Sequence, residues 1–207
     1  MYCMVLMQKK GATQISLLSD ADIGVLEPDL VLHPIERQAY VFLSDFRKDA
    51  FLRGRYALKS ILCCDIGNSM NELFVTTDGF GKPYVPCNTN VYCSISHTHG
   101  YASAAVSTQA AVGVDVEKIK IRHPALLRDI SHRSEVDQLL SVYPLENITT
   151  ILWVIKEAAA KADERIYPMS HYHVSVSDRL FVTRGASQWD VSLTVLSGHV
   201  FALAEAV

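Results

Sequence analysis

The sequence has no hydrophobic run that approaches the ~20 residues needed to cross a bilayer. Its opening residues also lack the charged start and the small-residue cleavage site of a secretory leader. We therefore expect a cytoplasmic protein with no membrane partner.

An excess of positive charge is also missing. The 207 residues include 19 Lys and Arg against 22 Asp and Glu, which gives a net charge of -3 with the histidines neutral. Because binding to a long nucleic acid depends on clustered basic side chains, we expect no nucleic-acid partner. A small anionic ligand remains open.

Paired cysteines and low-complexity sequence are scarce too. The five cysteines are odd in number and contain no C-x-x-C pair, so we expect neither a disulfide framework nor a zinc knuckle. With 49% hydrophobic and 20% charged residues, and no tract rich in Ser, Gly and Pro, the chain has the composition of a folded globular protein.

Helical and extended patterns alternate along the chain. Apolar residues recur at helical spacing in residues 40–62, 126–140 and 151–165. Extended stretches bounded by turn residues follow a strand pattern: residues 84–86, 91–96, 101–106, 110–116, 172–176, 180–183, 190–196 and 200–207. The mixture predicts an α/β (α+β) fold.

Two segments of the sequence echo each other. Residues 95–106 and 193–204 share an order of polar and apolar residues, and both read as a strand, a turn and a strand. Similar hairpins arise by chance, so this echo alone leaves an internal duplication open. It predicts a chain of two lobes, residues 1–109 and residues 110–207.

A pair of carboxylates closes the apolar run of residues 110–116. Asp115 and Glu117 stand two apart in a predicted strand, so both side chains project from one face, and Gly113 leaves space beside them. Like charges this close favour a hard divalent cation between them. The alternative is a solvated strand end neutralised by Lys118, and the pair alone does not decide between the two.

The helix predicted at residues 151–165 supplies further charges. Trp153, Lys156, Glu157, Ala160 and Lys161 have the spacing of one helix face. Glu157 and Lys161 have the spacing of an ordinary surface ion pair, which is the bland interpretation. Small neighbours around these charges would instead permit close approach by a ligand.

The first half of the chain offers candidates for anion binding. Ser96 and His97 follow a strand and precede a turn, although adjacent strand residues point to opposite faces and do not form a catalytic dyad. Lys82 lies before Pro83 in a fixed turn. A basic cluster is either a solvated helix face or a phosphate clamp, and it consists of Arg47, Lys48, Arg53 and Arg55.

Taken in order, five short motifs resemble the signature series of Sfp-type 4′-phosphopantetheinyl transferases, with agreement from about Asp45 to the C-terminus. The motifs are Gly54-Arg55, Gly81-Lys82-Pro83, Ser94-Ile95-Ser96-His97, the G-x-D-x-E of residues 113–117 and the W-x-x-K-E-A-x-x-K-A of residues 153–162. The last two are specific in combination.

The resemblance implies a fold of two similar lobes related by a pseudo-twofold axis, with coenzyme A as co-substrate. It implies transfer of the 4′-phosphopantetheine arm of coenzyme A to a serine of an acyl or peptidyl carrier protein, with release of adenosine 3′,5′-bisphosphate. Lobe 1–109 would contact the nucleotide of coenzyme A, and lobe 110–207 would hold Mg²⁺ and the catalytic residues.

The resemblance also implies roles for single residues. Asp115, Glu117 and Glu157 would hold Mg²⁺, Glu157 would act as general base, and Lys161 would stabilise the departing phosphate. A coenzyme A contact is implied for Lys82, Pro83, Ser96 and His97, and Lys156 would contact phosphate or orient the helix.

One departure from the family pattern concerns the segment around His33-Pro34, which lacks the lysines expected there. We hypothesise that Arg47, Lys48 or Arg53 replaces that contact. A non-catalytic relative of the same fold is the alternative function. A different magnesium-dependent phosphotransferase or nuclease is disfavoured, because the chain has no G-x-x-x-x-G-K-[ST] loop and is not basic. The length only suggests a monomer.

Overall fold

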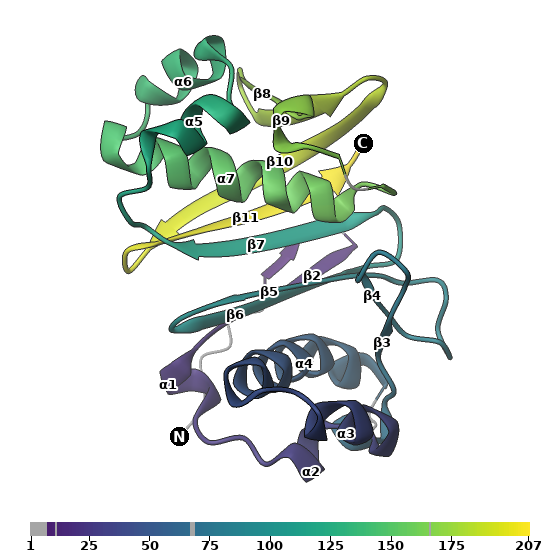
Figure 1. Cartoon of the computed structure of the whole chain (residues 1–207). Coiled ribbons are helices and arrows are strands. Elements are labelled where there is room, and N and C mark those ends of the chain that lie inside the picture. The colour runs from purple at the N-terminus through teal and green to yellow at the C-terminus, as the bar shows by residue number, and fades with distance from the viewer. Residues whose placement is uncertain (1–7, 11, 67–68, 166) are drawn as a thin grey trace. The chain divides into compact units, whose positions relative to one another are not determined.

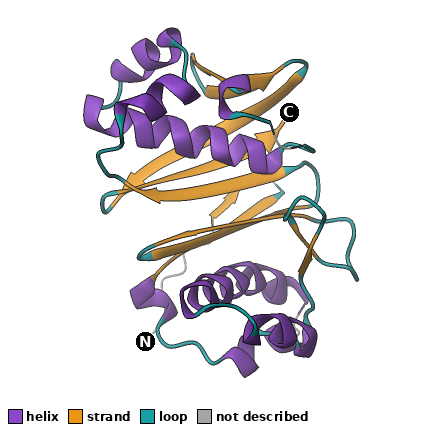
Figure 2. Cartoon of the chain, viewed as in Figure 1, coloured by secondary structure: helices purple, strands orange, loops and turns teal. Residues whose placement is uncertain are grey.

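The structure of the chain is a computed structural model that describes residues 8–10, 12–66, 69–165 and 167–207. The chain divides into two compact units, Met1–Gln109 and Ala110–Val207. Each unit combines an antiparallel sheet with helices that cover one of its faces (Figures 1 and 2). The α/β class expected from the sequence is confirmed.

The N-terminal unit is built on a four-stranded sheet in the order β1-β2-β6-β5. Its strands are β1 (Gln8–Lys10), β2 (Thr13–Ser19), β5 (Tyr92–Thr98) and β6 (Tyr101–Ser107). The long helix α4 (Asp45–Ile66) packs on this sheet and buries Ala57, Leu58 and Ile61 (Figure 1). The smaller elements are α1 (Asp20–Ile23), α2 (Pro28–Val31), α3 (Pro34–Val41), the 3-10 turn η1 (Met70–Glu72), β3 (Thr76–Thr77) and β4 (Pro83–Tyr84).

The C-terminal unit is built on a five-stranded sheet in the order β7-β11-β10-β9-β8. The strands are β7 (Val112–Lys118), β8 (His173–Val176), β9 (Leu180–Arg184), β10 (Ser187–Leu196) and β11 (His199–Ala206). Helix α7 (Leu145–Ala162) packs across β7 and β11, with Ile151, Leu152 and Ile155 fully buried (Figure 1). The remaining elements are α5 (Pro124–Ile130), α6 (Arg133–Leu140) and the 3-10 turn η2 (Met169–His171).

The two units repeat one arrangement. In each, a strand is followed by short helices (three in the N-terminal unit, two in the C-terminal unit), a long helix, a 3-10 turn, two short strands and a hairpin whose second strand returns beside the first strand. The orders β2-β6-β5 and β7-β11-β10 correspond strand for strand, and all of these pairs are antiparallel. The hairpins turn at Gly100 and Gly198, both with positive φ (92° and 73°), which glycine adopts without strain. The echo seen in the sequence is therefore part of a longer structural repeat, although the two sheets differ in their outer strands.

A buried lysine marks the repeat in the N-terminal unit. The side chain of Lys59 on α4 is fully buried, and its Nζ donates to the carbonyl oxygen of Val31 at 2.9 Å and to the carboxylate of Glu36. Glu36 lies in the first turn of α3 and accepts from the backbone N–H of His33 at 2.9 Å. The lysine therefore ties α4 to the end of α2 and the start of α3.

The C-terminal unit contains the same contacts. Lys156 on α7 is fully buried, and its Nζ donates to the carbonyl oxygen of Ile130 at 2.6 Å and to Glu135 at 2.9 Å. Glu135 lies in the first turn of α6 and accepts from the backbone N–H of His132 at 2.6 Å. Two long-range ionic contacts in corresponding places support an internal duplication more strongly than the hairpins alone.

Two expectations about single elements were incomplete. Residues 126–140 form two helices, α5 and α6, rather than one, because the chain breaks at Ser131 and restarts where Glu135 caps the N–H of His132. Strand β2 was missed, since its polar residues, such as Gln14 and Ser16, weaken the apolar pattern.

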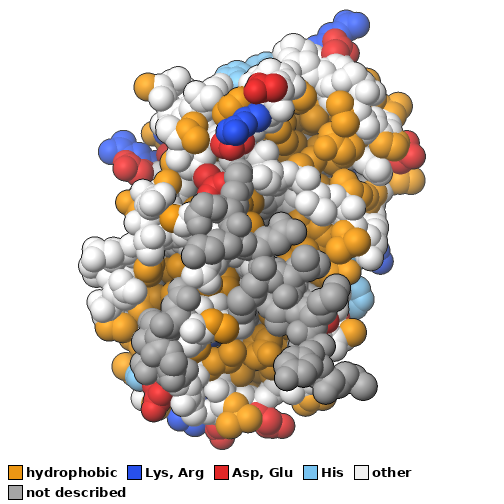
Figure 3. Space-filling model, turned by 180° about the vertical axis from the view of Figure 1, so that it is seen from behind, with side chains coloured by type: hydrophobic (Ala, Val, Ile, Leu, Met, Phe, Trp, Pro, Cys, Tyr) orange, Lys and Arg blue, Asp and Glu red, His pale blue; other side chains and the backbone are white. Residues whose placement is uncertain are grey.

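Several charges on the surface are paired with opposite charges. On the face shown in Figure 3, basic and acidic side chains lie next to one another in several places. Exposed pairs include Arg37 with Asp29 at 2.5 Å and Arg133 with Asp137 at 3.8 Å. In the part of the chain that the structure describes, no helix has the length and apolar character of a membrane span.

Candidate active site

The two carboxylates of the G-x-D-x-E motif lie on β7 where α7 crosses it. A Cβ added to Gly113 would lie 1.9 Å from the carbonyl oxygen of Ala158, so only glycine permits this close contact between helix and strand. The space expected beside the carboxylates is thus filled by the backbone of α7. The close contact places the helix residues that follow Ala158 near the strand residues that follow Gly113.

Lys161 connects the two elements directly. Its Nζ donates to Oδ1 of Asp115 at 2.7 Å and to the carbonyl oxygen of Val114 at 3.1 Å. Asp115 is buried, whereas the Lys161 side chain keeps 27% of its exposure. The bland interpretation of Lys161 as the partner of Glu157 on a solvated helix face does not describe these contacts, because the lysine reaches across to the strand.

Glu117 has a basic partner that the sequence did not suggest. Arg122, in the loop after β7, donates from one terminal nitrogen to Oε2 of Glu117 at 3.0 Å. Its guanidinium also lies over the indole of Trp153 on α7, 5.7 Å from the ring centroid, which is within the range of a cation–π contact. The expected partner, Lys118, is exposed at the strand end.

Glu157 lies on α7 between the positions of Trp153 and Lys161, one turn from each. Burial raises the pKa of its carboxyl group, Lys161 lowers it, and the charges of Asp115 and Glu117 raise it further, so the net shift is upward. Three carboxylates are therefore close enough to repel one another, and each of the two on β7 is held by a basic side chain.

These residues fit a hard divalent cation in their chemistry. Carboxylate oxygens are the ligands that Mg²⁺ takes in proteins, and a cation would relieve the repulsion that, after burial, contributes to the raised pKa of Glu157. Within the described residues, however, no three Asp, Glu, His or Cys side chains converge closely enough to hold a metal ion as they stand. Asp115 and Glu117 are instead directed to Lys161 and Arg122.

The prediction that Lys156 contacts coenzyme A is wrong for this conformation. Its side chain is fully buried, and its ammonium group is held by Ile130 and Glu135 inside the C-terminal unit. Burial lowers the pKa of Lys156, while the hydrogen bond and charge of Glu135 oppose that shift. The other expectation, that Lys156 orients the helix, agrees with these contacts.

The candidates around residue 82 and on β5 lie at the ends of two hairpins of the N-terminal unit. The carboxylate of Asp78 accepts from the backbone N–H of Lys82 at 2.9 Å and fixes the turn before Pro83. On β5 the neighbours Ser96 and His97 face opposite ways, with Ser96 buried and His97 exposed, as expected for adjacent strand residues. They therefore do not form one catalytic pair.

The basic cluster at the start of α4 is largely neutralised by acidic neighbours. The guanidinium of Arg53 lies 2.8 Å from a carboxylate oxygen of Asp49 and 2.9 Å from one of Asp20. The Nζ of Lys48 lies 3.5 Å from a carboxylate oxygen of Asp45. A cavity of about 430 Å³ borders this group and is lined by Gly24, Val25, Leu26, Tyr40, Asp45, Lys48, Asp49, Leu52 and Arg53.

The outer two members of that cluster differ from each other. Arg47 is exposed on the first turn of α4. Arg55 is buried and donates to Glu36 at 2.7 Å, so it belongs to the core and to neither a solvated face nor a phosphate clamp.

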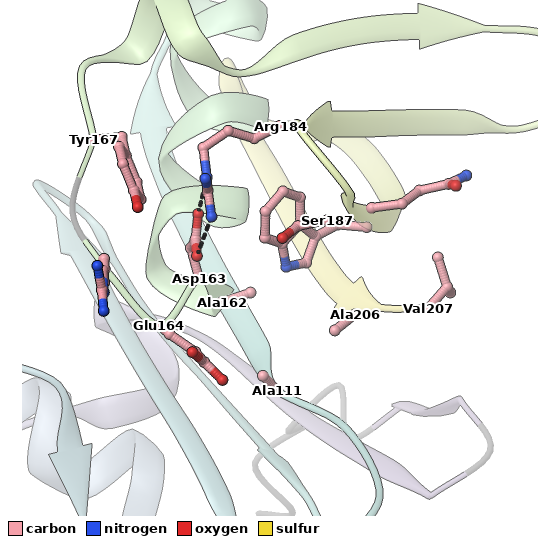
Figure 4. A pocket seen from close by; sticks show the side chains of 12 residues that line it. Ala111, Ala162, Asp163, Glu164, Tyr167, Arg184, Ser187, Ala206 and Val207 are labelled. Carbon is pink, nitrogen blue, oxygen red and sulfur yellow. Dashed lines mark hydrogen bonds and ion pairs between the residues drawn. The ribbon is translucent and has the colours of Figure 1, made fainter.

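A further hollow of about 460 Å³ lies in the C-terminal unit, beyond the end of α7 (Figure 4). Arg184 forms two hydrogen bonds with the buried carboxylate of Asp163, at 2.6 and 3.0 Å, and stacks on the ring of Tyr167. Its charge is thus already matched. No pattern in the sequence predicts this pair, which joins the end of α7 to β9.

Comparison with known proteins identifies the region that contains the carboxylates of β7 and the charged residues of α7. Residues 111–203 match a family model described as the 4′-phosphopantetheinyl transferase superfamily. The chain is 35% identical over 86 residues to a holo-[acyl-carrier-protein] synthase of Bacillus subtilis, an alignment that covers 37% of this chain and 71% of that protein. It is 34% identical over 87 residues to a synthase of the same name from a Geobacillus species, covering 38% of this chain and 73% of that protein.

A longer alignment relates the chain to the 4′-phosphopantetheinyl transferase psf-1 of Bacillus pumilus. The two are 30% identical over 127 residues, which cover 60% of this chain and 53% of that protein. The matched family region includes Asp115, Glu117, Glu157 and Lys161. The chain belongs to the 4′-phosphopantetheinyl transferase superfamily.

Proposed function

We propose that the chain transfers the 4′-phosphopantetheinyl group of coenzyme A to a serine of a carrier protein. One observation supports this most directly. Lys161 on α7 contacts Asp115 on β7, and the charges of Asp115 and Glu117 act on Glu157, all within the region matched by the family model. Carboxylates and a lysine gathered in this way suit the transfer of a phosphorylated group, which depends on positioning and charge neutralisation.

Glu157 is the proposed general base. The serine hydroxyl must lose its proton as its oxygen forms a bond to phosphorus, and a carboxylate oxygen of Glu157 would accept that proton. The upward shift of the Glu157 pKa, caused first by burial, makes this carboxylate a stronger proton acceptor than an ordinary glutamate.

Lys161 is the proposed charge-stabilising group. Its partly exposed ammonium lies at Asp115 and is close to Glu157, so it would contact phosphate oxygens as negative charge develops on adenosine 3′,5′-bisphosphate. Asp115, Glu117 and Glu157 would hold Mg²⁺, which supplies positive charge to the pyrophosphate of coenzyme A when it is bound.

We propose that four residues of the N-terminal unit contact the nucleotide of coenzyme A: Lys82, Pro83, Ser96 and His97. Arg47 is favoured over Lys48 and Arg53 as the replacement for the missing lysines, because the latter two have acidic partners within 3.5 Å. We further propose that the protein acts as a monomer in the cytoplasm, without nucleic-acid or membrane partners.

The test is a mass measurement on an apo carrier protein incubated with coenzyme A, Mg²⁺ and the full chain. We expect a gain of one phosphopantetheinyl group, and a loss of rate of about 100-fold to 10,000-fold for Glu157→Gln. The matched control is Glu146→Gln, an exposed glutamate in the first turn of the same helix, which should keep the wild-type rate. Asp115→Asn should also remove activity in a folded protein.

The alternative, a non-catalytic relative, predicts binding of coenzyme A with no mass gain for any carrier. Failure across fatty-acid, polyketide and peptide carriers, with coenzyme A binding intact, would favour that alternative. A near-wild-type rate for Glu157→Gln would remove the proposed base.

A further inference from the structure

The loop that follows β7 places a second cation at the proposed metal site. Arg122 is mostly buried, with 13% of its side chain exposed, and one terminal nitrogen donates to Glu117 at 3.0 Å. The guanidinium lies over Trp153, which precedes Glu157 by one turn of α7. Arg122 is therefore held between the strand that carries Glu117 and the helix that carries Glu157.

The two ion pairs have parallel positions around Glu157. Lys161, one turn after Glu157, holds Asp115 at 2.7 Å, and Arg122, stacked one turn before Glu157, holds Glu117 at 3.0 Å. A divalent cation that takes oxygen ligands from both strand carboxylates has to compete with both basic groups, since an ion pair and a metal use the same carboxylate oxygens.

The contact between Arg122 and Glu117 is also incomplete. Arginine matches a carboxylate best with two parallel hydrogen bonds, but here one nitrogen contacts one oxygen. The Nε of Arg122 is buried and has no hydrogen-bond partner among the described residues. A buried donor without a partner makes this arrangement easier to exchange for another.

We propose that Arg122 is a resident counter-ion that competes with the divalent cation for Glu117, so that metal binding displaces its guanidinium from Glu117 and from Trp153. This inference rests on the proposed function, because that function supplies the metal. Arg122 lies outside the motifs that carry the family resemblance, and it would set how tightly the site binds metal before any substrate arrives.

The first test measures metal binding by the full chain without coenzyme A or carrier protein. Mn²⁺ and Mg²⁺ are titrated by calorimetry, and free Mn²⁺ is counted by electron paramagnetic resonance. Arg122→Met should bind Mn²⁺ about fivefold to 30-fold more tightly than the wild type, the range expected for losing a competing, partly buried ion pair.

A matched control separates competition from a general effect of charge. Lys120→Met removes the same charge from an exposed position two residues away, and it should change the affinity by less than about twofold because exposed charges are screened. Arg122→Lys keeps the charge without the planar fork and should fall between the wild type and Arg122→Met. Equal gains for Lys120→Met and Arg122→Met would overturn the proposal.

The second test uses Trp153 as a reporter. Metal should change its fluorescence in the wild type, because the guanidinium leaves the indole, and should leave the emission of Arg122→Met unchanged. Trp189 is buried in the core and provides a constant background, which the Trp153→Phe variant measures. No change in the wild type at metal saturation, or no metal binding by either protein, would overturn the proposal.

The two proposals fail separately. Metal binding that tightens in Arg122→Met while no carrier protein is modified would retain the counter-ion and reject the transfer activity. Carrier-protein modification together with an unchanged metal affinity in Arg122→Met would retain the transfer activity and reject the counter-ion.

Discussion

We expect replacement of the two buried lysines, Lys59 and Lys156, to lower stability by unequal amounts. The reason is that their glutamate partners, Glu36 and Glu135, differ in the contacts that they keep once the lysine is removed. In Lys59→Met, Glu36 still accepts from the Nε of Arg55 at 2.7 Å and from the N–H of His33 at 2.9 Å. Its negative charge thus keeps a cationic partner. The main cost is the loss of hydrogen bonds to Glu36 and to the carbonyl of Val31.

Lys156→Met removes the cationic partner of Glu135 as well as the hydrogen bonds of the lysine. Glu135 then keeps only two hydrogen bonds among the described residues, from the backbone N–H groups of His132 at 2.6 Å and Val174 at 2.7 Å. A buried carboxylate that has lost its cation costs about 3–5 kcal/mol. The loss of hydrogen bonds in Lys59→Met costs about 1–3 kcal/mol. We therefore expect Lys156→Met to be the more destabilising by about 2 kcal/mol.

The measurement is urea unfolding followed by far-ultraviolet circular dichroism. Hydrogen exchange read by mass spectrometry assigns each loss to the unit that carries the change. Adding Glu135→Gln to Lys156→Met should recover part of the stability, since the neutral amide keeps an oxygen for the backbone donors without the buried charge. An equal or larger loss for Lys59→Met would refute the reasoning that Arg55 compensates for Lys59.

Two further predictions concern packing and pH. Gly113→Ala should lower the free energy of unfolding by more than about 3 kcal/mol or prevent folding, because its Cβ would lie 1.9 Å from the carbonyl oxygen of Ala158. The control is Gly79→Ala, whose Cβ would meet no atom within 4 Å. In the same unfolding assay it should stay within about 0.5 kcal/mol of the wild type. Burial alone would raise the pKa of Asp163, but hydrogen bonds from Arg184 and Tyr172 lower it overall. Its stabilisation is therefore present above the ordinary aspartate pKa of about 4 and is lost as pH falls through the lowered value. Asp163→Asn should be less stable than the wild type at pH 6 by a margin that shrinks below about pH 4, and a constant margin would contradict this.

The sequence predicts the candidate site residues that follow local spacing or the family motif, but not those brought in by long-range contacts. Asp115 and Glu117 were recognisable because strand spacing puts them on one face, and Glu157 and Lys161 because helical spacing and the family motif identify them. Arg122 gave no signal, since its contacts with Glu117 and Trp153 depend on how a loop folds back. No pattern in the loop itself encodes that path.

Lys156 shows why adjacency in a motif misleads. It is the neighbour of Glu157 in the sequence, but successive helix residues point about 100° apart. One side chain therefore reaches Glu135 in the core while the other is close to the carboxylates of β7. Burial of a lysine also needs a partner, and that partner lies 21 residues away, which no local pattern reveals.

The structural repeat distinguishes residues that maintain the shared fold from residues for which we propose a role in the reaction. Lys59 and Lys156 occupy corresponding places on α4 and α7 and make the same two kinds of contact. The residue after the lysine is Ser60 on α4, which donates to the carbonyl of Ala57 at 2.8 Å, but it is Glu157 on α7. A contact present in both units belongs to the fold that both share, whereas a carboxylate present in one unit is not required by that shared fold. By this argument the lysine of the W-x-x-K-E motif serves the scaffold, and its glutamate is available for the catalytic role that we propose for it.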